Sequence, residues 1–190
     1  MAREKKQEKT MSKSIHGSKK RKTEKMTPLI ETLIADLASN DDMARVKARH
    51  SLVAMGKIAV PLLTEALESK KYLIRWEAAK ALTEIGDPGA APALVEALED
   101  EEFDVRWIAG EGLIKMNING LKPLLQALKE RADSPFLREG AHHVLHDLAK
   151  GALRESLTPV LGALEVMEPV EEIPLIAHKA LEILDAIKKL

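Results

Sequence analysis

Three histidines have a spacing that could bind a metal ion. His142 and His146 are four residues apart, so in a helix their rings would lie on one face. His178 occupies the position equivalent to His142 in the next repeat of the chain. Imidazole is a frequent zinc ligand, and paired histidines at this spacing occur in metal sites. We expect no bound metal and interpret the three as solvated, pH-responsive side chains, with a mononuclear metal site as the alternative.

The two tryptophans of the chain, Trp76 and Trp107, each follow an arginine and lie 31 residues apart. A helical wheel at about 100° per residue divides the second of these segments into a core side and an open side. The core side holds Val105, Ala109, Gly112, Leu113 and Met116. The open side holds Trp107, Gly110, Glu111 and Ile114. Both tryptophans are therefore predicted to face away from the core.

Tryptophan on an open surface is favoured at binding hot spots. We predict a partner-binding surface formed by Trp76, Lys80, Trp107, Glu111 and His143. The alternative is that both rings lie flat over their helices and only fill space. Lys80 and Glu111 have opposite charges at matching positions, so this surface does not select strongly for polyanions.

An internal repeat organises these residues. The segment Ile74–Gly86 is nearly repeated 31 residues later by Val105–Asn117. A fixed period in the low thirties predicts stacked helical hairpins rather than one globular enzyme core. The same register aligns four arginines, namely Arg45, Arg75, Arg106 and Arg138.

A second motif marks the first helix of each hairpin. It reads VPLLTEAL, APALVEAL, KPLLQAL and TPVLGAL, and we expect its proline to lie in the first turn of the helix, where the missing N–H costs nothing. Both helices of the unit have apolar residues at i, i+3, i+4 and i+7, which is helical spacing. The predicted repeats span about residues 27–56, 57–86, 87–117, 118–150 and 151–190, and residues 26–190 form one domain.

The segments APALVEALEDEEFDVRW and EAAKALTEIGD resemble the HEAT repeat, in particular the short prokaryotic type named after phycobiliprotein lyases. This resemblance covers all of the chain except its first residues. It implies an all-α fold, a right-handed α-solenoid of about five stacked helical hairpins, related to armadillo-like helical folds. It also implies that the second helices, which carry both tryptophans, line the concave surface. It says little about function, because this repeat serves scaffolds and enzymes alike.

The resemblance also implies a structural role for the arginine ladder, through bonds to an aspartate of the preceding turn and to neighbouring repeats. A phosphate-binding role is the less favoured alternative. The turn of repeat two, SKKYLI, has no aspartate, so we expect the ladder to be incomplete at Arg75. Repeat five has Pro174 where the arginine would fall, and a terminal repeat is expected to be atypical.

Deoxyhypusine hydroxylase resembles the same repeat and binds two irons through His-Glu pairs. At the matching position this chain has Trp76-Glu77, and the next repeats have Trp107-Ile108 and Glu139-Gly140. Because no His-Glu pair remains at these positions, di-iron activity is not expected. No nucleophile elbow, phosphate loop or acid/base dyad is present in the sequence. Lyase or metal-dependent activity is therefore less favoured than a non-catalytic role, and no cofactor is expected.

The charge of the chain is unevenly distributed. Residues 1–25 hold ten lysine or arginine residues and three glutamates, a balance of +7, whereas the rest of the chain has a balance of −8. This first segment has too few apolar residues to fold, so we predict a disordered basic tail that includes Lys19, Lys20, Arg21 and Lys22. It could bind nucleic acid or an acidic partner, serve as a solubilising leader, or fold back on its own acidic body.

The composition agrees with a repeat protein. Of its 190 residues, 45% are hydrophobic but only 3% are aromatic, so the predicted core consists of aliphatic side chains. There is no cysteine, and no apolar run approaches the ~20 residues of a membrane span. We therefore predict a cytoplasmic scaffold that holds a protein partner in its concave surface. The alternative is a nucleic-acid-binding protein that uses the basic arm and base stacking on Trp76 and Trp107.

Overall fold

The computed structural model describes residues 26–165 and 171–187. In these ranges the chain forms helices, turns and loops, and no strand occurs. The helices are residues 26–36, α2 (Asp42–Met55), α3 (Val60–Ala66), α4 (Tyr72–Ile85), α5 (Ala91–Glu96), α6 (Phe103–Met116), α7 (Ile118–Glu130), α8 (Pro135–Leu148), α9 (Arg154–Glu165) and α10 (Ile173–Ile187). The predicted basic tail, with Lys19, Lys20, Arg21 and Lys22, lies outside the described residues.

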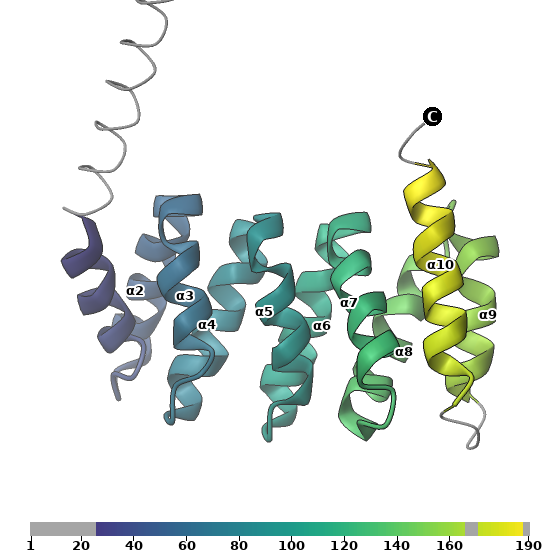
Figure 1. Ribbon diagram of the computed structural model, residues 1–190. Coiled ribbons are helices and arrows are strands. Elements are labelled where there is room, and N and C mark those ends of the chain that lie inside the picture. The colour runs from purple at the N-terminus through teal and green to yellow at the C-terminus, as the bar shows by residue number, and fades with distance from the viewer. Residues whose placement is uncertain (1–25, 166–170, 188–190) are drawn as a thin grey trace, which may run out of the picture.

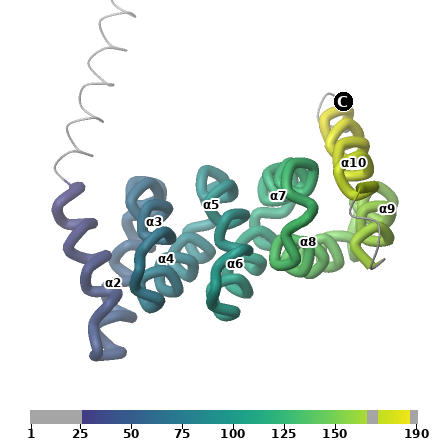
Figure 2. The backbone as a smooth tube through the Cα atoms, turned by 60° about the horizontal axis from the view of Figure 1, so that its bottom comes forward, coloured from purple at the N-terminus to yellow at the C-terminus, as the bar shows by residue number. Residues whose placement is uncertain are grey.

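The helices form a stack of hairpins in two layers (Figures 1 and 2). One layer contains α3, α5 and α7, and the other contains α4, α6 and α8. We call the outer side of the second layer the second-helix face. Adjacent second helices pack on one another more extensively than adjacent first helices do. The all-α solenoid predicted from the sequence is confirmed.

Local sequence explains where the helices begin and end. The Asp41 carboxylate caps α2 by accepting the N–H of Met43, and the Ser134 hydroxyl caps α8 in the same way. Gly86 follows α4 with a φ of 67°, a left-handed conformation that glycine adopts at little cost. These residues therefore fix the ends of the helices, and with them the length of each hairpin.

The prolines follow the prediction in two repeats and not in the next two. Pro61 and Pro92 are in the first turn of α3 and α5, but Pro123 and Pro159 lie inside α7 and α9. The difference lies in the residues before the motif. In repeats two and three they form separate 3-10 segments, whereas before Pro123 they are already part of the α-helix.

The core of the described chain is built from leucine, alanine, valine and isoleucine and contains no fully buried aromatic ring. Small residues let the helices approach closely. A Cβ at Gly120 would lie 2.4 Å from the carbonyl oxygen of Leu113, so this position in the first turn of α7 accepts only glycine. A Cβ at Gly112 would meet the Thr83 hydroxyl at 2.6 Å, where α6 crosses α4.

The last hairpin is inverted relative to the others. In a regular stack α10 would pack on α8, but it packs on α7, and α9 takes the place beside α8 (Figure 1). The apolar stripe of α10 is buried there, and Lys122 of α7 forms an ion pair with Asp185 of α10. The alignment of α10 with the second helices was therefore wrong. Pro174 stands where the other repeats have their arginine, so this hairpin lacks the turn anchor described below.

Candidate functional site

All five phenylalanine, tyrosine and tryptophan residues of the chain lie in the N-terminal halves of three consecutive second helices. They are Tyr72 and Trp76 of α4, Phe103 and Trp107 of α6, and Phe136 of α8; we call them the aromatic surface. In α4 and in α6 the two rings are four residues apart and in contact, with ring centroids separated by 6.3 and 6.1 Å. The same aromatic pair is thus presented by neighbouring repeats.

Trp107 is the most accessible tryptophan, with 46% of its surface exposed. One face of its ring stacks on His143 of α8 at a centroid distance of 4.5 Å. Beside it lies an apolar notch of about 80 Å³ between α6 and α8. Gly110 and Gly140 line this notch, and Leu98 packs so closely on Gly140 that a Cβ there would lie 2.9 Å from its side chain.

Trp76 is half-buried and packs against the core, so its role is partly structural. The Lys80 ammonium lies 3.9 Å from the centre of its ring, a cation–π contact. Burial lowers the pKa of Lys80 below its usual value, and the neighbouring Glu77 carboxylate opposes that shift. An open groove lined by both tryptophans and by Phe103 connects this cluster to Trp107.

The five residues predicted to bind a partner form two clusters. Trp76 and Lys80 form one, and Trp107 and His143 belong to the other, where an oxygen of Glu111 lies 3.0 Å from the His143 Nε2. Sequence reasoning missed the other three members of the aromatic surface. A signal for two of them was available, because Tyr72 and Phe103 precede the two tryptophans by four residues, one helical turn.

The arginine ladder anchors the turn inside each hairpin. In all four repeats the guanidinium Nη1 donates to the backbone carbonyl six residues earlier. The pairs are Arg45 with Ser39 (2.7 Å), Arg75 with Ser69 (3.0 Å), Arg106 with Asp100 (2.8 Å) and Arg138 with Ala132 (3.0 Å). This bond ties the start of the second helix to the end of the first, as a structural role requires, and leaves less of each guanidinium for a ligand.

The expectation that the ladder is incomplete at Arg75 was wrong. Arg75 makes the most contacts of the four, because the next repeat supplies the carboxylates that its own turn lacks. Its Nε and Nη2 donate to the two oxygens of Asp100 at 2.7 and 3.0 Å, and Nη2 also contacts Glu101. Arg75 therefore joins repeat two to repeat three.

Glu77 is the one acidic residue of the di-iron motif that this chain retains, and it is used in an ion network. Its side chain is only 2% exposed, and it accepts from Arg49 of the preceding repeat at 2.8 Å. Arg45 and Lys80 approach it within 4.0 Å. Burying a carboxylate is costly unless it is paired, so Glu77 and Arg49 stabilise the junction of the first two repeats.

A family model described as HEAT repeats matches residues 30–114. These residues of the chain are HEAT repeats. A solved chain from the complex of CpcE and CpcF of phycocyanin lyase from Nostoc sp. PCC7120 is similar to it, with 26% identity and a TM-score of 0.55 over 80% of this chain and 99% of that one. An engineered protein is similar over 83% of this chain and 79% of its own, with 20% identity and a TM-score of 0.42. No curated protein sequence matches. The family match and the similarity to the phycocyanin lyase chain confirm the resemblance to the phycobiliprotein-lyase type of repeat.

The three histidines do not come together in this HEAT-repeat protein. His142 and His146 stack on α8 with centroids 6.1 Å apart, but α10 lies in the other layer, and His178 is near Glu182 of its own helix. Within residues 26–165 and 171–187, no group of three or more metal-ligating side chains is found. The three histidines therefore do not form one set of metal ligands here, because the last hairpin is inverted.

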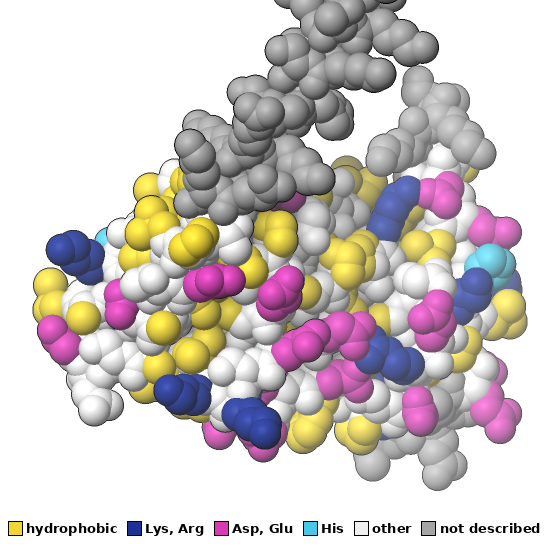
Figure 3. All heavy atoms as spheres, turned by 60° about the vertical axis from the view of Figure 1, so that its left-hand side comes forward, with side chains coloured by type: hydrophobic (Ala, Val, Ile, Leu, Met, Phe, Trp, Pro, Cys, Tyr) yellow, Lys and Arg dark blue, Asp and Glu magenta, His cyan; other side chains and the backbone are white. Residues whose placement is uncertain are grey.

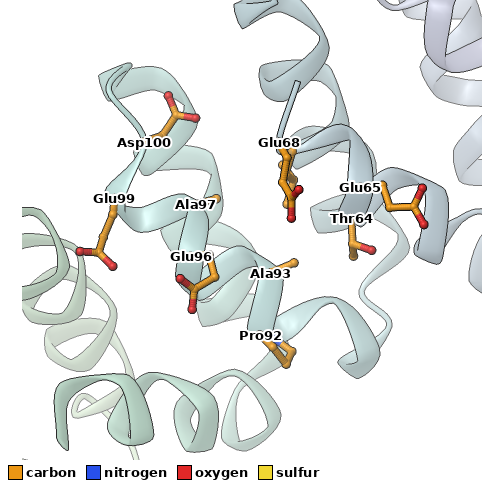
Figure 4. Close-up of a pocket in the computed structure, with 10 residues that line it drawn as sticks. Thr64, Glu65, Glu68, Pro92, Ala93, Glu96, Ala97, Glu99 and Asp100 are labelled. Carbon is orange, nitrogen blue, oxygen red and sulfur yellow. The ribbon is translucent and has the colours of Figure 1, made fainter. Parts of the chain in front are cut away.

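A second hollow lies on the opposite face, between α3 and α5, with a volume of about 480 Å³ (Figure 4). Its charged lining residues are all acidic, and they repeat with the period of the chain: Glu65 and Glu68 from one repeat, Glu96 and Glu99 from the next, and Asp100. Acidic side chains also gather along the part of the surface seen in Figure 3. Arg131 neutralises part of this charge through contacts of 2.7 Å with Glu96 and Glu99.

None of the described helices combines the length and the apolar character that a membrane-spanning helix needs.

Proposed function

We propose that this HEAT-repeat protein binds a protein partner on its second-helix face, over the aromatic surface, and that it catalyses no reaction of its own. One observation carries the proposal: every aromatic residue of the chain other than histidine lies in this one region. Three of them, Phe103, Trp107 and Phe136, are exposed. Such rings lose contact with water when a partner covers them, which is why tryptophan and tyrosine dominate binding hot spots.

The geometry of the region supports a protein ligand. The notch beside Trp107 is narrow and apolar, and the groove between the two tryptophans is open and shallow. Together they suit the side chains of a peptide or a helix better than an enclosed small molecule. The similar Nostoc chain was solved in a complex of two proteins, which is consistent with a binding role for this fold.

The nucleic-acid alternative gains no support from the described residues. Asp104, Glu111 and Glu139 carry negative charge around the exposed rings, and phosphate groups would be repelled there. The basic arm that would supply the attraction lies outside the described residues. The cytoplasmic location inferred from the sequence stays a prediction.

The test compares two full-length variants. Trp107→Ala removes the exposed ring from the aromatic surface, and Leu175→Ala removes a side chain of similar exposure (56%) from α10 in the other layer. Each is used to retain partners from a nuclease-treated lysate of the source organism, and circular dichroism checks the helical content. Truncation at a hot spot costs about 2 kcal/mol or more, so we expect Trp107→Ala to weaken retention of a specific protein at least about 30-fold. Equal retention by both variants would exclude the aromatic surface.

A further inference from the structure

At the start of α6 an exposed aromatic ring is flanked in the sequence by two carboxylates, those of Glu102 and Asp104. Residues 99–104 read EDEEFD, so five of the six are acidic and the sixth is Phe103, which is 55% exposed. Phe103 lines both the groove beside Trp76 and the notch beside Trp107. Asp104 lines the groove, and Glu139 lines the notch. The apolar part of the aromatic surface therefore has an acidic rim.

The cations nearest to this rim already have partners. The Arg106 guanidinium donates to the carbonyl oxygens of Asp100 and Glu101 and lies 4.3 Å from the centre of the Phe136 ring. The Arg75 guanidinium is held by Asp100 and Glu101. The exposed carboxylates of Glu102, Asp104 and Glu139 thus leave a local excess of negative charge next to two apolar depressions.

This arrangement selects a ligand of definite chemistry. The notch is small, about 80 Å³, and mostly apolar, so it has room for one aliphatic side chain. The carboxylates around it favour lysine or arginine close to that side chain. The complementary ligand is a peptide segment in which an isolated aliphatic residue is flanked by several basic ones.

The chain itself contains one such segment. Residues 11–22 read MSKSIHGSKKRK, with Met11 and Ile15 as the aliphatic residues and five lysine or arginine residues among the twelve. We propose that this segment binds in cis to the acidic rim of the aromatic surface, with Ile15 or Met11 in the notch and the run Lys19–Lys22 against the carboxylates. The opposite charges of residues 1–25 and of the rest of the chain, +7 and −8, provide the long-range attraction.

The length of the chain permits this contact. Ile15 precedes Met26, the first described residue, by eleven positions. An extended chain spans about 3.4 Å per residue, so Ile15 can lie up to ~37 Å from Met26. The notch is roughly two and a half repeats away, which is about 25 Å at a helix spacing of ~10 Å. The length of the first helix, about 16 Å, increases the separation to roughly 30 Å.

The inference rests on the proposed function, since it assigns a regulatory occupant to the same binding surface. A partner must displace the basic segment before it can bind. The segment therefore lowers the apparent affinity of the surface for any partner. It also predicts that partner binding becomes stronger when the segment loses its charge.

The two tryptophans of the chain both lie in this surface, so intrinsic fluorescence reports on it alone. We would measure quenching by acrylamide on the full-length protein and on two variants with equal charge changes. One replaces Lys19, Lys20, Arg21 and Lys22 with glutamine, and the control replaces Arg3, Lys5, Lys6 and Lys9 with glutamine. Because rings at an occupied hot spot are shielded from water, the quenching constant should rise about twofold in the first variant and stay unchanged in the control. Ile15→Asp should have the effect of the first variant.

High salt should reproduce the change in the wild-type protein, because the screening length falls from about 10 Å at 0.1 M to about 3 Å at 1 M. Equal quenching constants in all variants would overturn the inference. Quenching that depends on protein concentration would also overturn it, because the segment would then bind a second copy. The measurement needs no partner, so unchanged quenching together with loss of partner retention in Trp107→Ala would refute the inference and leave the proposed function intact.

Discussion

Arg75 should be the most important arginine of the ladder for stability, and Arg75→Met tests this. Its side chain and that of Asp100 are each 8% exposed, and two nitrogens meet two oxygens at 2.7 and 3.0 Å. The hydrogen bonds that Arg75 donates to the Asp100 carboxylate raise the pKa of Arg75 above its usual value, and burial opposes this shift. Removing one partner of a buried ion pair costs about 3–5 kcal/mol. In Arg75→Met the Asp100 carboxylate would still accept a hydrogen bond from the N–H of Glu102 at 2.9 Å. We therefore expect the free energy of unfolding to fall by the lower end of this range, about 3 kcal/mol.

Arg138→Met is the matched control for Arg75→Met. Arg138 makes the equivalent bond to a carbonyl, that of Ala132 at 3.0 Å, but the described residues show no carboxylate in contact with it. Loss of this bond in Arg138→Met should lower the free energy of unfolding by about 1.5 kcal/mol, the contribution of one hydrogen bond to a charged group.

For a chain of this size 1 kcal/mol shifts the midpoint by about 2–4 °C, so thermal unfolding should show a drop of roughly 6–12 °C for Arg75→Met and about half of that for Arg138→Met. The first variant should also broaden or split the transition, because it weakens one junction between repeats. Equal losses in the two variants would refute a dominant contribution from the ion pair between repeats.

Two further predictions concern single residues. Gly120→Ala should lower the free energy of unfolding by about 2 kcal/mol or more, because its Cβ would lie 2.4 Å from the carbonyl oxygen of Leu113. Gly162→Ala in α9 has nothing within 4 Å and should raise it by about 0.5–1 kcal/mol; a loss in both variants on urea unfolding would contradict this reasoning. Burial, and then the hydrogen bond that the Tyr72 hydroxyl donates to Asp104, raise the pKa of this single tyrosine above 10.0. Absorbance titration should show the raised midpoint, and Asp104→Asn should lower it. Since the folded state keeps the proton longer than the unfolded state, the stability contributed by Tyr72 should be lost as the pH rises through that midpoint.

The all-α solenoid could be predicted from the sequence because each helix carries its own apolar stripe. Ala109 and Leu113 are fully buried, as the helical wheel indicated. Gly110 was expected to be open but is buried, because α8 of the next repeat covers it. The wheel describes one helix at a time, so it misses burial that a neighbouring repeat provides.

The position of the last hairpin could not be predicted for a related reason. The apolar stripe of α10 shows that this helix needs a partner, but it does not say which one, and the structure pairs it with α7 and α9. The arginine that fixes the turn in the other repeats is replaced by Pro174. His178 was therefore assigned to the wrong layer.

The distribution of aromatic residues is the strongest argument that the second-helix face has a function. Large aromatic rings usually stabilise a core more than smaller side chains do, because they bury the most apolar area. Here the fully buried residues are aliphatic, and the helices approach closely enough for Gly112 and Gly120 to be required, so the stack has little room for a ring. Stability alone therefore explains why rings are excluded from the interior. It does not explain why Phe103 and Trp107 are exposed at positions equivalent to those of Tyr72 and Trp76 in the neighbouring repeat. An exposed ring contributes little to folding, whereas a ring covered by a partner or by the chain's own basic segment contributes to binding.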